Sequence, residues 1–323
     1  SHDNYMKIDP EAQRRTLEFI ERNAKAGKPF YVANWPNLTS FIPNPKKCST
    51  SRSILQDGLQ CNIDPFIGEI MTRLKELGIA ENTLVVAMAD NGPMTHNPPP
   101  GLGMAETIFR GGKGDFLEGG VRVPAQAWWP GVIEPGQLVG DIIHETDLFT
   151  TFARLAGAME HIPTDRVIDG IDQTSLLMNG DTHSRRDYVF IYAGPTLGAT
   201  VKGNYKRHWI SPDPVGEASG IPAAFYFLPA DPREVTPMLV NLIHLKSPFN
   251  RMKLRHDLWK EKYPDSHEVY GIPWTGIANA SPEIKALAKP KLDLTKVPFD
   301  PLEYVEHLDQ LPFDPGMDPG IGK

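Results

Sequence analysis

Apolar positions follow two different spacings in the first 160 residues. Three segments repeat apolar residues every three or four positions, which predicts amphipathic helices over residues 11–26, 64–77 and 145–158. Three others are short, continuous apolar runs, which predicts buried strands over residues 29–34, 83–89 and 121–129. Helices that alternate with buried strands predict an α/β fold with a doubly wound, mostly parallel sheet.

The residues beside the first two helical segments match known helix boundaries. Asp9 is a good N-cap and Pro10 suits the first turn, so the first helix is expected to begin there. Gly27 and Gly78 follow the two segments directly, where a glycine commonly ends a helix. We therefore expect both helices to stop at these glycines.

The pattern changes near residue 170, where shorter segments begin. Four of them are typical of strands in a small antiparallel sheet, with Gly203-Asn204 as a two-residue hairpin turn: residues 188–192, 199–202, 205–210 and 224–228. Helices are predicted over residues 235–245 and 256–262, and an extended Pro-rich tail follows from about residue 282. The predicted organisation is an α/β domain over residues 1–185, a subdomain with the antiparallel sheet over 186–280, and the tail over 281–323.

Charge and composition exclude several classes of partner. The formal net charge of −7 disfavours a nucleic-acid backbone as ligand. No apolar run approaches the roughly 20 residues of a membrane span. Two cysteines, Cys48 and Cys61, specify neither a disulfide framework nor a zinc site. The chain shows no secretory signal, but it begins at Ser1 and not at Met, so no compartment follows.

The strand predicted over residues 83–89 ends at Asp90-Asn91-Gly92. Ligands of open α/β sheets gather at the carboxyl ends of strands, and carboxylate and amide oxygens suit a hard cation. The alternative is an ordinary turn, which this tripeptide also favours when it stands alone.

The loop that follows, residues 91–120, carries two candidate ligand contacts. Lys113 lies among glycines that let the backbone approach a ligand, and its ammonium group suits a phosphate or sulfate oxygen. His96 could contact a substrate. Each residue has a simpler interpretation, a solvated lysine or an incidental histidine. Glu118 and Arg122, which bracket two glycines further on, are expected to brace the loop.

Taken in order, these motifs resemble the sulfatases of the alkaline-phosphatase superfamily, most of all the bacterial arylsulfatase branch. The resemblance covers residues 5–192 and rests on these elements: Lys28-Pro-Phe-Tyr-Val, Asp90-Asn-Gly, Phe109-Arg-Gly-Gly-Lys113, Glu118-Gly-Gly-Val-Arg-Val-Pro124 and Trp129-Pro-Gly-Val-Ile-Glu-Pro-Gly136. It implies an alkaline-phosphatase-like fold and hydrolysis of a small-molecule sulfate ester.

The resemblance also implies roles for single residues. Asp90 and Asn91 match positions that coordinate a divalent cation, usually Ca²⁺, and Lys113 matches the lysine that binds a sulfate oxygen. Glu118 and Arg122 match structural positions. Many relatives are periplasmic or secreted, although a cytoplasmic location stays open here. The tail could join two copies of the chain into a homo-oligomer.

The family nucleophile is a formylglycine made within a Cys-x-Pro-x-Arg motif far upstream of Asp-Asn-Gly, and we identify no nucleophile here. Cys48-Ser-Thr-Ser-Arg52 imitates that motif, but it lies too close to Asp90 and is interpreted as an ordinary loop. We therefore expect this chain alone to be inactive. Two alternatives stay open: a phosphodiesterase or phosphonate monoester hydrolase of the same superfamily, and a non-catalytic, sulfatase-like binding protein.

Overall fold

The computed structural model describes five stretches of the chain: residues 2–36, 63–93, 108–210, 224–238 and 243–264. The chain divides into two compact units, of which the larger spans Asp9–Pro264 and the smaller combines Ser1–Ile8 with Asp265–Lys323. The architecture below is that of the larger unit. The predicted Pro-rich tail lies outside the described residues, and the three predicted domains stay predictions.

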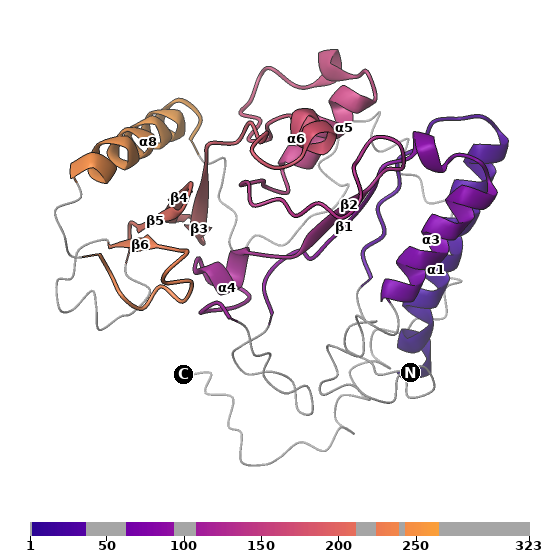
Figure 1. The fold of residues 1–323 in the computed structure, drawn as a ribbon, viewed down its shortest axis with the longest axis horizontal. Coiled ribbons are helices and arrows are strands. Elements are labelled where there is room, and N and C mark those ends of the chain that lie inside the picture. Colours follow the sequence, from indigo (N-terminus) through magenta and orange to yellow (C-terminus); the bar gives the residue numbers. More distant parts are fainter. Residues whose placement is uncertain (1, 37–62, 94–107, 211–223, 239–242, 265–323) are drawn as a thin grey trace, which may run out of the picture. The chain divides into compact units, whose positions relative to one another are not determined.

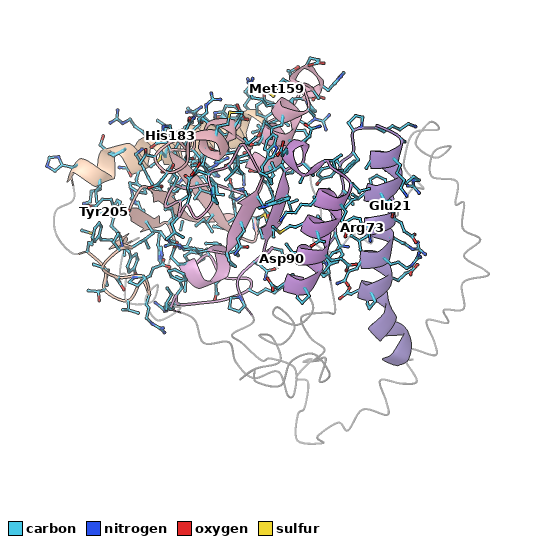
Figure 2. All side chains as sticks on the ribbon, turned by 45° about the vertical axis from the view of Figure 1, so that its right-hand side comes forward. Glu21, Arg73, Asp90, Met159, His183 and Tyr205 are labelled. Carbon is cyan, nitrogen blue, oxygen red and sulfur yellow. The ribbon has the colours of Figure 1, made fainter. Side chains whose placement is uncertain are left out.

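Two helices open the described chain, α1 (His2–Lys25) and α3 (Asp64–Glu76). They lie side by side in both views, with Glu21 and Arg73 labelled on neighbouring helices in Figure 2. Each buries part of one face, where Phe66 and Leu74 of α3 are almost fully covered. The predicted ends are confirmed, because Gly27 and Gly78 follow the helices with φ of 60° and 68°.

The start of α1 differs from the prediction. The helix begins at His2, so Asp9 is not its N-cap and Pro10 lies inside it. A proline inside a helix loses its N–H bond to the carbonyl four residues earlier, and its ring crowds that carbonyl, so Pro10 weakens α1 locally without ending it. A short 3-10 helix, η2 (Ala80–Asn82), joins α3 to the next strand.

The predicted strand over residues 29–34 is wrong. The segment is extended, but no described strand lies beside it to pair with its backbone. Its side chains alternate between exposed and half-buried, and Tyr31 and Trp35 are 70% and 88% exposed. The apolar residues of this segment therefore do not mark a strand of either sheet among the described residues.

Strands β1 (Val85–Met88) and β2 (Ala125–Trp128) form a two-stranded sheet (Figure 1). They are shorter than the runs that predicted them. Their pairing is antiparallel, with Val85 opposite Trp128 and Met88 opposite Ala125. The described part of the chain therefore contains the predicted central strand but only antiparallel pairings around it.

Residues 141–187 form a helical region held by one buried carboxylate. The elements are α5 (Asp147–Leu155), η3 (Met159–His161) and α6 (Thr174–Asn179), so the helix predicted over residues 145–158 is confirmed with tighter bounds. Asp147 begins α5 and is 1% exposed. Arg186 donates to both of its oxygens, at 2.8 Å from Nε and 2.5 Å from Nη2.

A four-stranded antiparallel sheet follows, as predicted: β3 (Tyr188–Ala193), β4 (Thr196–Lys202), β5 (Tyr205–His208) and β6 (Phe225–Phe227). Lys202 pairs with Tyr205 across the predicted Gly203-Asn204 turn, where Gly203 has a φ of 53°. Alternate residues serve the two faces of the sheet. Ile191 and Val201 pack with Phe116 and Leu117 on one face.

The other face of this sheet packs against α8 (Ile243–Lys262), through Phe225, Phe249 and Met252 (Figure 1). The helix predicted over residues 235–245 is wrong in its first part. The Asp231 carboxylate accepts hydrogen bonds from the backbone N–H groups of residues 235 and 236, which holds this segment in a turn. Glu234 in that turn has a φ of 52°, outside the right-handed helical region.

Candidate functional site

Asp90 and Asn91 lie where they were expected, just beyond the carboxyl end of β1 (Figure 2). The Asp90 side chain is exposed and that of Asn91 is half-buried. The Asn91 Nδ2 group donates to the carbonyl oxygen of Gly92 at 2.7 Å. This bond occupies the nitrogen of the amide and leaves its oxygen to accept hydrogen bonds or to bind a cation.

Gly92 holds the strand end against two further glycines. Its N–H donates to the carbonyl oxygen of Gly120 at 2.9 Å, and the N–H of Ala89 donates to that of Pro124 at 3.2 Å. A Cβ atom on Gly92 would come within 1.8 Å of the Gly119 carbonyl oxygen. Only a glycine fits this approach, so the position of Asp90 and Asn91 is coupled to the backbone of residues 119–120.

The loop with Lys113 is fixed by a compact turn. Gly111 and Gly114 have φ of 82° and 95°, which favours glycine at both places. The Asp115 carboxylate accepts the N–H of Gly112 at 2.9 Å. The N–H of Lys113 itself donates to the carbonyl oxygen of Pro93 at 2.9 Å, while its side chain is exposed. The backbone of Lys113 therefore lies beside the segment that carries Asp90 and Asn91.

These residues fit a hard cation only in part. Ca²⁺ prefers hard oxygen ligands, and the Asp90 carboxylate and the Asn91 amide oxygen are two such ligands on consecutive residues. Within the part of the chain that the structure describes, however, no group of three or more His, Cys, Asp or Glu side chains is arranged to hold a metal ion. The described residues thus supply two candidate ligands of an incomplete coordination shell.

A buried cluster of charged groups lies behind the two glycines. It begins with α4 (Glu118–Val121), whose Glu118 side chain is buried. Lys206 of β5 is fully buried and donates from Nζ to Glu118 Oε1 at 3.0 Å. Glu234, also fully buried, lies 3.2 Å from the same Nζ atom and accepts the Glu118 N–H at 2.6 Å. The burial of Glu118 agrees with its interpretation as a bracing residue.

His208 completes this cluster, and its Nε2 atom lies 2.5 Å from Glu234 Oε2. Burial lowers the pKa of His208, and the opposing effect of the Glu234 carboxylate is smaller. Its buried Nδ1 has no hydrogen-bond partner among the described residues, which fits a neutral ring with the proton on Nε2. Burial raises the pKa of Glu234, but His208, Lys206 and the Glu118 N–H together lower it more, so Glu234 is ionised at neutral pH.

Two predicted residues cannot be placed. His96 and Cys48 lie outside the described residues, as does Cys61. Arg122 lies at the end of α4, with Nη1 3.6 Å from Glu118 Oε2 and its guanidinium carbon 4.9 Å from the centre of the Phe109 ring. That position agrees with a bracing role.

Sequence reasoning missed Lys206, His208 and Glu234. A signal was present for the first two, because polar residues two apart on a strand point to the same face, here the face that buries Ile191 and Val201. Glu234 gave no comparable signal, since its partner Glu118 lies 116 residues away in the sequence.

Known proteins with similar structures define the class of this fold. PsFucS1 sulfatase from Pseudoalteromonas sp. superposes with a TM-score of 0.67 and 28% identity, over 80% of this chain and 54% of that chain. The fold is alkaline-phosphatase-like, which confirms the predicted fold class. Residues 47–158 match the family model Sulfatase, which agrees with the predicted resemblance to sulfatases.

Relatives with curated functions match a large part of the chain. The steryl-sulfatase of Rattus norvegicus is 34% identical over 215 residues, which are 66% of this chain and 35% of that protein. The N-acetylgalactosamine-6-sulfatase of Mus musculus is 42% identical over 202 residues, or 60% of this chain and 37% of that protein. The chain thus spans little more than a third of the length of these relatives. None of the described helices is both long and apolar enough to cross a membrane.

Proposed function

We propose that the protein to which this chain belongs is a sulfuric ester hydrolase that cleaves a small-molecule organic sulfate. The match to the family model Sulfatase and the similarity to curated sulfatases support this activity. The observation that carries the proposal is the pair of backbone hydrogen bonds from Gly92 to Gly120 and from Lys113 to Pro93. They bring the lysine loop beside the strand end with Asp90 and Asn91, so one charged ester could contact both.

In this proposal Asp90 and Asn91 hold a divalent cation, most suitably Ca²⁺, through their side-chain oxygens. A bound cation would polarise the oxygens of the sulfate group. The exposed Lys113 ammonium contacts a sulfate oxygen and offsets the negative charge that develops as the S–O bond breaks. Each group interacts with the ester, and neither acts as the nucleophile.

We further propose that the 323-residue chain alone does not hydrolyse a sulfate ester. No Cys-x-Pro-x-Arg motif occurs in its sequence. Among the described residues, Asp90 and Asn91 are the two candidate ligands of the cation, and a complete coordination shell needs further ligands. The chain should therefore bind the cation and inorganic sulfate weakly without hydrolysing an ester.

Titration calorimetry with CaCl₂ and then with sodium sulfate tests the two binding roles. Asp90→Ala should weaken calcium binding at least tenfold, because it removes the only carboxylate of this ligand pair. Lys113→Ala should weaken sulfate binding and leave calcium binding within twofold of the wild type. Lys28→Ala, which removes an exposed lysine beyond α1, is the matched control and should change neither.

An aryl sulfate assay with calcium present tests the inactivity of the chain. No turnover above the buffer rate is expected. Rapid turnover that persists in Cys48→Ala would reveal an unrecognised nucleophile and refute this account. If the wild-type chain binds no calcium, the cation role of Asp90 and Asn91 is wrong.

A further inference from the structure

The buried charge cluster is joined to the candidate cation site by hydrogen bonds at both ends of the short backbone segment from Glu118 to Gly120. Lys206 binds both Glu118 and Glu234, and Glu234 accepts the backbone N–H of Glu118. The next two residues after Glu118 are the glycines that contact the strand end. Gly120 accepts the N–H of Gly92, the residue directly after Asn91.

A second set of hydrogen bonds holds the same two residues, Gly119 and Gly120 (the glycine turn), from the other side. Arg110 donates from Nη1 to the carbonyl oxygen of Glu234 at 3.1 Å. The carbonyl oxygen of Arg110 accepts the N–H of Gly119 at 2.8 Å. Glu234 thus holds the glycine turn twice, through Glu118 and through Arg110.

The glycine turn has no room in which to shift independently. A Cβ on Gly119 would meet the carbonyl oxygens of Arg110 and Gly111 at 2.4 Å, and one on Gly120 would meet that of Asp115 at 2.3 Å. The backbone of Gly119 and Gly120 therefore lies against that of residues 110–112 and 115, and Gly92 packs against both glycines. In such close packing, a displacement of Glu118 must be passed on to Gly92.

Burying these charged groups costs free energy, and apolar packing could hold the loop without that cost. Two carboxylates and an ammonium group are desolvated together, and apolar side chains of the same volume often stabilise a fold as well or better. Directional bonds, unlike apolar contacts, fix the orientation of the groups that they join. The face of the sheet beside the cluster already has its apolar packing, through Phe116 and Leu117.

We propose that Lys206 and Glu234 are positioning residues for the cation-binding strand end. Acting through Glu118 and the glycine turn, they set the position of Gly92 and hence the direction in which Asp90 and Asn91 present their oxygens. This inference rests on the proposed function for its purpose, but the coupling of the cluster to Gly92 can be measured without a metal.

Amide hydrogen exchange of the whole chain, measured by mass spectrometry on peptides that cover residues 86–93, follows the end of β1 together with the Gly92 N–H. Lys206→Met keeps the volume of the side chain and removes its charge. Glu234→Gln is the milder variant, because the amide oxygen can still accept the Glu118 N–H, and it is used if Lys206→Met does not fold. Asp147→Asn is the matched control, since it disturbs a buried ion pair whose bonds run to residues 144, 171, 173 and 186.

Exchange in residues 86–93 should be at least tenfold faster in Lys206→Met and faster by a smaller factor, still above twofold, in Glu234→Gln, whereas Asp147→Asn should leave it within twofold. Calorimetry with CaCl₂ should show at least tenfold weaker binding in the cluster variants only. Unchanged exchange in residues 86–93, or equal acceleration in Asp147→Asn, overturns the proposal. Faster exchange in a chain that binds no calcium even as wild type supports the coupling to Gly92 and overturns the proposed cation role instead.

Discussion

Replacing Asp147 by alanine removes the acceptor on which the helical region of residues 141–187 depends. Five hydrogen bonds end on this carboxylate. They come from Arg186 Nε and Nη2, from the N–H groups of His144 and Ile171, and from Gln173 Nε2. The side chains of Asp147 and Arg186 are only 2% and 9% exposed, so water cannot readily replace the lost partner.

The expected loss follows from this burial. Removing one member of a buried ion pair costs about 3–5 kcal/mol, because the other charge stays desolvated and unpaired. A domain of this size loses about 2–4 °C in melting temperature per kcal/mol. The melting temperature of Asp147→Ala should therefore fall by roughly 6 to 20 °C.

The pH dependence gives a second, independent check. Burial raises the pKa of Asp147, but the hydrogen bonds from Arg186, Ile171 and His144 lower it more, so its pKa in the folded state is below the ordinary value. The stabilisation is then complete above the unfolded pKa of about 3.9 and is lost as the pH falls through the lower, folded-state value. The difference between wild type and variant should narrow only in that acidic range.

Urea unfolding followed by circular dichroism at pH 7 and at several acidic pH values measures both effects. Asp165→Ala is the control, because Asp165 forms an exposed ion pair with Arg166 and should contribute less than about 1 kcal/mol. If Asp147→Ala were no more destabilising than Asp165→Ala, the buried carboxylate would not be organising this region.

Two further predictions concern the glycines and the histidines. Gly92→Ala should lower the free energy of unfolding by about 1–3 kcal/mol or more, since its Cβ would overlap the Gly119 carbonyl. Gly68→Ala, with open space around its Cβ within α3, should raise the free energy of unfolding by about 0.5–1 kcal/mol. Equal effects of the two variants in urea unfolding would contradict the packing described here. Burial lowers the pKa of both His144 and His208, so the unfolded chain takes up protons first and the free energy of unfolding should fall as the pH drops below about 6.5. The change in the free energy of unfolding per pH unit should be smaller in His144→Asn. A free energy of unfolding that rises on acidification from pH 7 to 5.5 would show that the pKa direction is wrong.

Local chemistry made much of the fold predictable from the sequence. Glycines that end helices and the Gly203-Asn204 turn act through the backbone of a few neighbouring residues, and all of them appear as expected. The same is true of the strands around that turn, because their alternation reflects a sheet with two packed faces. Such features need no knowledge of distant parts of the chain.

The errors arose where distant or neighbouring segments override a local preference. Residues 29–34 have the composition of a strand, yet a strand also needs a partner, and none lies beside them among the described residues. The start of α1 could not be read from Asp9 and Pro10, because the helix continues through both residues to His2. Composition alone could not weigh these contributions.

The candidate site divides in the same way. Asp90, Asn91 and Lys113 could be proposed from short motifs and from the resemblance to sulfatases. Lys206 and Glu234 could not, since they meet Glu118 across 88 and 116 residues of sequence and gain their meaning only from burial. Charged residues on a short strand such as β5 look like an exposed edge until the fold is known.

The small sheet of β1 and β2 has a practical consequence for producing the chain. Among the described residues this sheet has two strands, so each strand is an edge there, and the residues of β2 are exposed or half-buried. Open edges recruit other strands, and two-stranded sheets have little stability of their own. Soluble yield should therefore fall as expression temperature and protein concentration rise, and light scattering during concentration would reveal it. A co-expressed strand-forming segment that pairs with either edge should raise the yield, which offers a direct way to identify sequences that bind to this sheet.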